Sequence, residues 1–163
     1  MVLGDSSKIE SHFFIKNRTY VFFDKEKVFS YGKKTNMGDY DGDEAKGIWI
    51  PGRKEGITTI DGLKIGFEIC FDHNFGTLAD HMGSTGKNLD LHIICSAEVP
   101  NEQARCMAKP DGYLLHASTG AGNQEHTAVY KQGKGINWTK IDSQPVGGNF
   151  GGHLRLYVID VGA

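Results

Sequence analysis

Hydrophobic and polar positions along the chain follow two different periods, which predicts a fold that combines strands with helices. Aromatic and β-branched residues dominate the segment 12–23, and the charged sequence DKEK separates it from the short apolar segment 28–31. This pattern indicates a β-hairpin. The predicted strands are all apolar runs bounded by turn residues: 13–23, 48–50, 56–60, 63–71, 89–96, 113–118 and 154–161.

Helical spacing occurs at two places between these strands. Residues 75–82 carry apolar side chains at the i, i+3, i+4 and i+7 positions, and 101–109 contains good helix formers before Pro110. Helices are therefore expected over 75–82 and 101–109, packed on one face of the sheet. The alternation predicts an α/β layered fold in a single domain over 1–163, because this length can bury one sizeable core.

The balance of charge narrows the class of protein. Eighteen basic and twenty acidic side chains give a net charge of -2, so no excess of positive charge attracts nucleic acid or an anionic membrane surface. The longest apolar runs are far shorter than the roughly 20 residues that cross a bilayer. We therefore expect no nucleic-acid partner and no membrane partner.

The three cysteines, Cys70, Cys95 and Cys106, include no CxxC pair. This pattern suits reduced thiols and a cytoplasmic protein better than a disulfide framework. Cys70 lies where the strand in GLKIGFEICFDHNF (62–75) passes through a turn into a helix. Such a turn offers free backbone N–H groups to a thiolate and a developing oxyanion, so it suits a nucleophile. The alternative is a small buried hydrophobic residue, since free cysteines are among the most buried residues.

The sequence GFEICFD (66–72) resembles the nucleophile motif G-x-x-I-C-[YF]-D of the nitrilase or carbon-nitrogen hydrolase superfamily. Upstream, NRTYVFFDKEKVFSYGKK resembles the hairpin that leads to the catalytic lysine of this family, and downstream NLDLHIICSAEVP and YVIDV follow its order of strands. The resemblance implies a nitrilase-like layered sandwich of the αββα type. It also implies that the domain is incomplete at its N-terminus, because the chain begins almost at the hairpin.

The resemblance implies a hydrolase for amide or nitrile carbon-nitrogen bonds that needs no cofactor and no metal. In this family a cysteine thiolate attacks, a lysine stabilises the tetrahedral intermediate, and a glutamate transfers protons. Cys70 matches the nucleophile. Lys34 or Lys33 matches the lysine, and Lys34 is preferred because KTN resembles the K-x-H of the family, with Asn36 in place of histidine.

The proton-transferring glutamate of the family lies upstream of the hairpin and has no counterpart here. Asp41 falls where a second acid of the family often lies. Glu68 alternates with Cys70 along the strand, so we expect it on the same face as Cys70, where it would be a supporting acid. The residues expected to contact a substrate flank these motifs: Asn36, Phe71, His73 and Glu98. A metal site is not expected, because the histidines form no HxxxH or HxH pair.

Three functional interpretations stay open. The first is a hydrolase of small amides or nitriles whose activity is impaired, or depends on a second copy of the chain or on a complementing N-terminal chain. The second is a non-catalytic relative that keeps the fold for binding or assembly. The third is an unrelated cysteine deamidase that uses Cys70 with a histidine such as His116 or His126.

Overall fold

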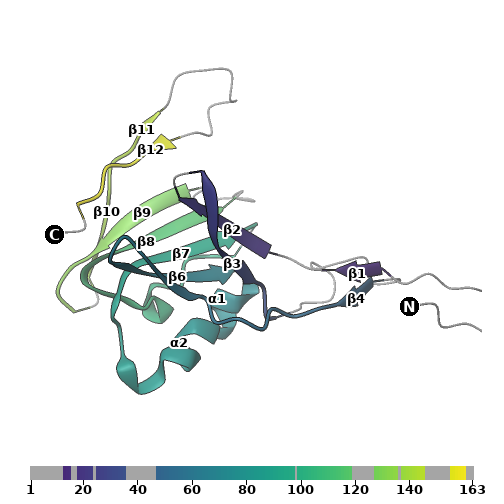
Figure 1. Cartoon of the computed structure of the whole chain (residues 1–163). Coiled ribbons are helices and arrows are strands. Elements are labelled where there is room, and N and C mark those ends of the chain that lie inside the picture. The colour runs from purple at the N-terminus through teal and green to yellow at the C-terminus, as the bar shows by residue number, and fades with distance from the viewer. Residues whose placement is uncertain are drawn as a thin grey trace, which may run out of the picture.

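A six-stranded mixed β-sheet forms the centre of the structure (Figure 1). The structure is a computed structural model, and the residues that it describes are 13–15, 18–23, 25–35, 47–97, 99–118, 127–135, 137–145 and 155–160. From one edge of the sheet to the other, the strands are β10 (Trp138–Lys140), β9 (Thr127–Gln132), β8 (Ala108–Ser118), β7 (Leu89–Ser96), β6 (Leu63–Ile69) and β5 (Ile57–Ile60). Strands β6, β7 and β8 run parallel, and the outer pairs are antiparallel.

Short helices pack on one face of this sheet. They are α1 (Phe71–Phe75) and α2 (Thr77–Met82), followed by the single 3-10 turns η2 (Gly83–Thr85) and η3 (Gln103–Arg105). Leu78 and Met82 of α2 pack against Leu89 and Met107. Gly66 makes this approach possible, because a Cβ atom there would lie 2.4 Å from a methyl group of Leu89 and 2.8 Å from one of Leu78. The first glycine of the motif is therefore a packing requirement.

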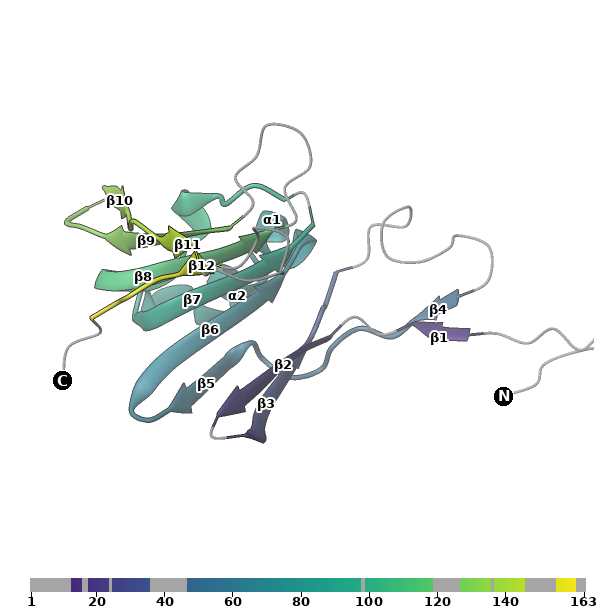
Figure 2. The ribbon, with the colours of Figure 1, turned by 90° about the horizontal axis from the view of Figure 1, so that it is seen from above.

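A β-hairpin covers part of the opposite face. It consists of β2 (Arg18–Phe23) and β3 (Glu26–Gly32), paired antiparallel, and lies beside the β5–β6 edge of the sheet (Figure 2). Tyr31 belongs to a buried cluster with the alternate β6 residues Ile65, Phe67 and Ile69. Phe29 stacks on Phe67 with 5.3 Å between ring centres. The hairpin thus brings the end of β3 next to the end of β6.

Two small ladders complete the described fold. Strand β1 (Phe13–Ile15) pairs parallel with β4 (Gly47–Trp49), and β11 (Gln144–Pro145) pairs antiparallel with β12 (Arg155–Leu156). The hydroxyl of Tyr113 donates to the carbonyl of Asp160 at 2.7 Å, which ties the last described segment to β8. None of the helices in the described ranges has the length and apolar character that a membrane-spanning helix needs.

The mixed sheet with short helices confirms the general class predicted from the sequence, and several elements fall where they were expected. Strand β7 coincides with the prediction over 89–96, and β2 with β3 forms the predicted hairpin. The predicted strand 13–23 is divided into β1 and β2. Within 154–161, the described residues form a strand only at β12.

The predicted helix over 101–109 is wrong. Only the turn η3 is helical there, and strand β8 begins before the predicted helix would end. The backbone of Met107 explains the difference, because its N–H donates to Nδ1 of His92 at 3.2 Å and its carbonyl accepts from the N–H of Leu89 at 3.1 Å. These contacts with β7 override the helix propensity of the segment.

The predicted boundaries around Cys70 also shift. The predicted strand 63–71 ends at Ile69, and helix α1 begins at Phe71, so Cys70 alone forms the junction. The predicted helix 75–82 is interrupted at Gly76, whose left-handed φ of 69° ends α1 before α2 begins.

Candidate functional site

Cys70 occupies a strained position in the turn between β6 and α1. Its φ of 54° and ψ of -117° are unusual for a residue with a side chain, and such conformations cost on the order of 1–3 kcal/mol. Its N–H donates to the carbonyl of Cys95 at 2.8 Å, and its carbonyl accepts from the N–H of His73 at 3.0 Å. The half-buried Cys70 packs against the cluster of Tyr31 and β6 on the hairpin side of the sheet. The surrounding structure therefore holds this thiol in a fixed place.

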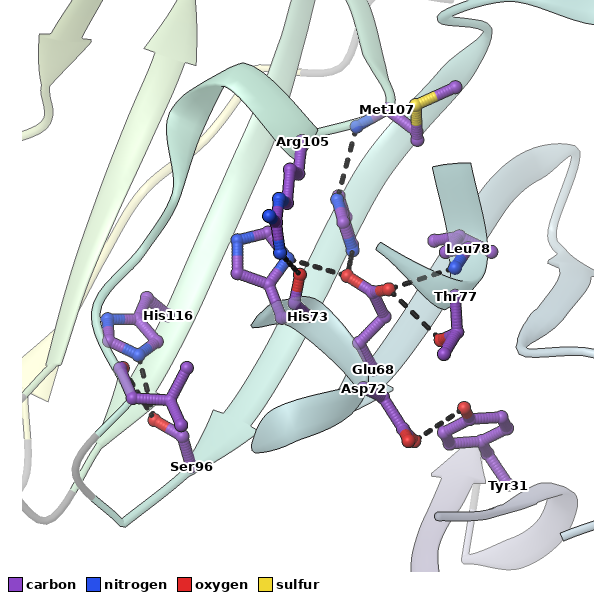
Figure 3. Close-up of polar contacts among 12 residues, drawn as sticks. Tyr31, Glu68, Asp72, His73, Thr77, Leu78, Ser96, Arg105, Met107 and His116 are labelled. Atoms are coloured by element: carbon purple, nitrogen blue, oxygen red, sulfur yellow. Dashed lines mark hydrogen bonds and ion pairs between the residues drawn. The ribbon is translucent and has the colours of Figure 1, made fainter. Parts of the chain in front are cut away.

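Asp72 fastens the end of β3 to this turn. Its carboxylate is fully buried and accepts hydrogen bonds from the hydroxyl of Tyr31 at 2.7 Å and from the hydroxyl and N–H of Thr35, both at 2.8 Å. The N–H of Lys34 contacts both carboxylate oxygens, at 3.0 and 3.1 Å. Burial first, and then the Asp72 carboxylate, raise the pKa of Tyr31 well above its usual value, so this hydroxyl stays a donor. Figure 3 shows Tyr31 pointing at Asp72.

The two adjacent lysines have different surroundings. The side chain of Lys33 is 1% exposed, and its Nζ lies 5.5 Å from the centre of the Phe71 ring, next to Cys70 in sequence. The Lys34 ammonium instead forms an ion pair with the carboxylate of Glu55 near the surface. Lys33, and not the preferred Lys34, is therefore the lysine that lies against the turn.

Glu68 forms a buried network on the helix side of the sheet (Figure 3). Its Oε2 accepts a hydrogen bond from Nδ1 of His73 at 2.6 Å and lies 3.1 Å from Nε2 of His92. The second contact is an electrostatic one, because its alignment falls short of a hydrogen bond. The other oxygen, Oε1, accepts from the N–H of Leu78 at 2.9 Å and from the hydroxyl of Thr77 at 3.3 Å. Every oxygen of this carboxylate is thus occupied.

The protonation of this network follows from its contacts. The N–H of Met107 donates to Nδ1 of His92, so the proton of neutral His92 lies on Nε2, toward Glu68. Burial lowers the pKa of His92, which favours this neutral form. Burial opposes ionisation of Glu68, but the hydrogen bond from His73 and the close contact with His92 outweigh it and lower the pKa of Glu68 to about 2.

Glu68, His73 and His92 are also the one set of side chains in the described ranges with the spacing of a metal site. Their contacts do not fit a bound ion. Two ligand atoms on one zinc ion, each at about 2.0–2.1 Å, are separated by more than 3 Å, whereas Oε2 of Glu68 lies 2.6 Å from Nδ1 of His73. His92 would also present a proton to the ion instead of a lone pair. Glu68 instead joins the two histidines through a hydrogen bond with His73 and a close electrostatic contact with His92.

Comparisons with known proteins bear on the fold. No family model and no curated protein sequence matches the chain. Among solved structures, glutamine-dependent NAD+ synthetase from Acinetobacter baumannii matches with a TM-score of 0.52 and 13% identity over 77% of this chain and 26% of the synthetase. Nit3 of Saccharomyces cerevisiae, a member of branch 10 of the nitrilase superfamily, has a TM-score of 0.49, 18% identity and coverage of 77% and 52%. An amidase of the nitrilase superfamily from Nesterenkonia AN1 has a TM-score of 0.44, 18% identity and coverage of 66% and 44%.

The fold of this chain partly matches that of the synthetase, and its other structural neighbours include nitrilase-superfamily proteins. The matched region spans between about a quarter and about half of these proteins. At this level of identity the likeness concerns the fold alone, so the chemistry of Cys70 is argued from its surroundings.

Glu68 does not share the face of Cys70, which corrects the alternation expected along β6. Cys70 packs on the hairpin side, and Glu68 lies among the helices. The cause is the left-handed backbone of Cys70, which interrupts the strand geometry on which alternation depends. The use of Glu68 as a supporting acid stays a prediction, as does the use of Phe71 and His73 in substrate binding. His73 is fully buried.

The remaining candidates divide into two groups. Asn36, Asp41, Glu98 and His126 lie outside the described residues. His116 is buried on β8, where its Nε2 lies 2.9 Å from the hydroxyl of Ser96. The residues that the sequence analysis missed are those that organise the turn: Tyr31, Lys33 as first choice, Asp72 and His92.

Proposed function

We propose that this chain is a hydrolase-like protein of the nitrilase superfamily that attacks the carbon of a small amide or nitrile with the thiolate of Cys70. The observation that carries the proposal is the strained turn at Cys70, with the buried Lys33 ammonium 5.5 Å from the ring centre of the adjacent Phe71. Lys33 is 1% exposed and contacts Phe71. A strained backbone that many contacts maintain is typical of functional sites.

The chemistry can be followed for an amide substrate. The thiolate forms a bond to the carbonyl carbon, and the carbonyl electrons move to the oxygen, where the charge of Lys33 stabilises them. The carbon-nitrogen bond then breaks, and the amine leaves with a proton. Water hydrolyses the resulting thioester to a carboxylate and restores the thiol of Cys70.

Proton transfer needs a further group. Among the described residues, the carboxylates of Glu68 and Asp72 adjoin the turn, but hydrogen bonds occupy both oxygens of each. A supporting acid would have to come from outside the described residues, as would be the case for Asp41, or from another chain. We therefore propose that turnover by the isolated chain is impaired or depends on a partner.

The proposed partner completes a layered αββα sandwich of which this chain forms part. Tyr20, Phe22 and Val28 on the hairpin are 50%, 65% and 47% exposed, an apolar surface that favours contact with another chain. The partner is a second copy of this chain or a chain that supplies the N-terminal part of the fold. Sedimentation of the purified chain distinguishes a homo-oligomer from a monomer that awaits a different chain.

The experiment that tests the chemistry uses an activated ester and a panel of small amides and nitriles. We expect the ester to leave an acyl group on the peptide that contains Cys70, detected by mass, and expect Cys70→Ala to abolish it. Cys95→Ala is the matched control, because Cys95 is also half-buried and lies on the adjacent strand. Absence of acylation at Cys70, with the protein folded, would refute the proposal and favour a binding or assembly role.

A further inference from the structure

The hydrogen bond between Glu68 and His73 spans the nucleophile turn. Glu68 is two residues before Cys70 and His73 three residues after it, and Nδ1 of His73 lies 2.6 Å from Oε2 of Glu68. The N–H of His73 also donates to the carbonyl of Cys70 at 3.0 Å. One residue, His73, therefore contacts both the strand before the turn and the peptide of the nucleophile itself.

This bridge is anchored on two further elements. Oε1 of Glu68 accepts from the N–H of Leu78 in α2, and Oε2 lies near His92 in β7. The carbonyl of His73 accepts from the guanidinium of Arg105 at 3.4 Å. Glu68 is 1% exposed and both histidines are fully buried. Water cannot replace these contacts, so the bridge fixes the separation between the end of β6 and the start of α1.

The known requirements of a buried carboxylate do not explain why its partner is His73. The N–H of Leu78 and the side chain of His92 could satisfy Glu68 without a residue from the turn. Moreover, Nε2 of His73 is buried without a hydrogen-bond partner in the described part of the structure. An imidazole that keeps one unpaired nitrogen in the core is retained here for the contact that its other nitrogen makes.

We propose that Glu68 and His73 are a positioning pair that holds Cys70 in its left-handed conformation from the helix side of the sheet. Asp72 holds the Lys33 segment from the opposite side. The pair does not touch a substrate and acts through the backbone of Cys70. The purpose of the fixed Cys70 conformation rests on the proposed function, whereas the role of the pair in fixing that conformation does not.

The test compares two substitutions of His73. Phenylalanine keeps the ring volume and removes the donor, whereas asparagine places an amide N–H near the position of Nδ1. A third variant, Leu114→Val, loosens the core on β8 away from the turn and controls for general loss of stability. In each folded variant, amide hydrogen exchange is measured for the peptide that covers 70–76, together with the rate at which iodoacetamide labels Cys70.

We expect exchange of this peptide to rise at least about tenfold in His73→Phe, which corresponds to about 1.4 kcal/mol, and to stay within about threefold of the wild type in His73→Asn. Labelling of Cys70 should slow in His73→Phe and recover in His73→Asn, with Leu114→Val unchanged in both measurements. Equal effects of Phe and Asn, or none from Phe, would overturn the proposal. The exchange measurement keeps its meaning even if wild-type Cys70 proves unreactive, an outcome that would refute the proposed function alone.

Discussion

Removing the carboxylate of Asp72 should destabilise the fold and slow the reaction of Cys70 together. Asp72→Ala leaves the buried hydroxyl of Tyr31 without its acceptor, together with the N–H groups of Lys34 and Thr35 and the Thr35 hydroxyl. A buried unsatisfied donor costs about 1–3 kcal/mol, and partly buried donors cost less because water can reach them. The variant also avoids the free-energy cost of burying the charged carboxylate, which offsets part of the cost of the unsatisfied donors.

The net loss that we expect for Asp72→Ala is about 3 kcal/mol in the free energy of unfolding. Tyr31→Phe removes one hydrogen bond to a charged acceptor and should cost about 1.5 kcal/mol. Asp72→Asn should fall between these values, since its oxygen can still accept from the Thr35 hydroxyl and N–H.

Urea denaturation measures these losses from the midpoint, provided that the slope stays constant. Labelling of Cys70 at pH 7 is measured on the folded variants. A loss below about 1 kcal/mol in Asp72→Ala would show that the end of β3 is held by other contacts. A large loss in stability with unchanged labelling would separate Asp72 from the site.

Three further predictions concern the charges around the turn. Lys33→Met should slow labelling of Cys70 at pH 7 by about tenfold, since a cation near a thiolate contributes on the order of 1.4–4 kcal/mol, whereas Lys34→Met should change it less than about twofold; the reverse order would favour Lys34 as the lysine of the site. Acidification should destabilise the fold in two steps: below pH 6.5, because the lowered pKa of His92 makes the unfolded chain bind more protons, and between pH 4.5 and about 2, where the stability that ionised Glu68 contributes above pH 4.5 is lost. His92→Gln should reduce the difference in unfolding free energy between urea titrations at pH 7.5 and 5.5. An equal difference in wild type and variant would refute the assignment of the first step to His92. Dialysis against EDTA should alter neither the thermal midpoint nor the labelling rate, and a stoichiometric metal ion found by elemental analysis would contradict the hydrogen-bonded interpretation of the Glu68 network.

The sequence predicted those parts of the fold in which local pattern and tertiary packing agree. The apolar run of β7 could only be a covered strand, and the hairpin of β2 and β3 had both its strands and its turn in the pattern. The segment 101–109 failed because its helix propensity is a local quantity, whereas the contacts of Met107 with β7 are formed by residues more than ten positions away. The surroundings of Lys33 and Lys34 also could not be told apart from the local pattern, because they depend on contacts with Phe71 and Glu55. Tyr31 and Lys33 are both buried, whereas Gly32 between them is less so.

The motif GFEICFD is best understood as the description of one turn, because most of its positions have a separate physical task. Gly66 admits the side chains of α2 and β7, Glu68 joins the strand to His73, and Asp72 captures the end of β3. Cys70 is the position at which alternation fails, so the side chains before and after it are directed to opposite sides of the sheet. Glu68 is a neighbour of Cys70 in sequence, whereas the buried Lys33 follows the end of β3, more than thirty residues upstream. The contacts of Asp72 with Tyr31, Lys34 and Thr35 hold the segment that contains Lys33 beside the turn.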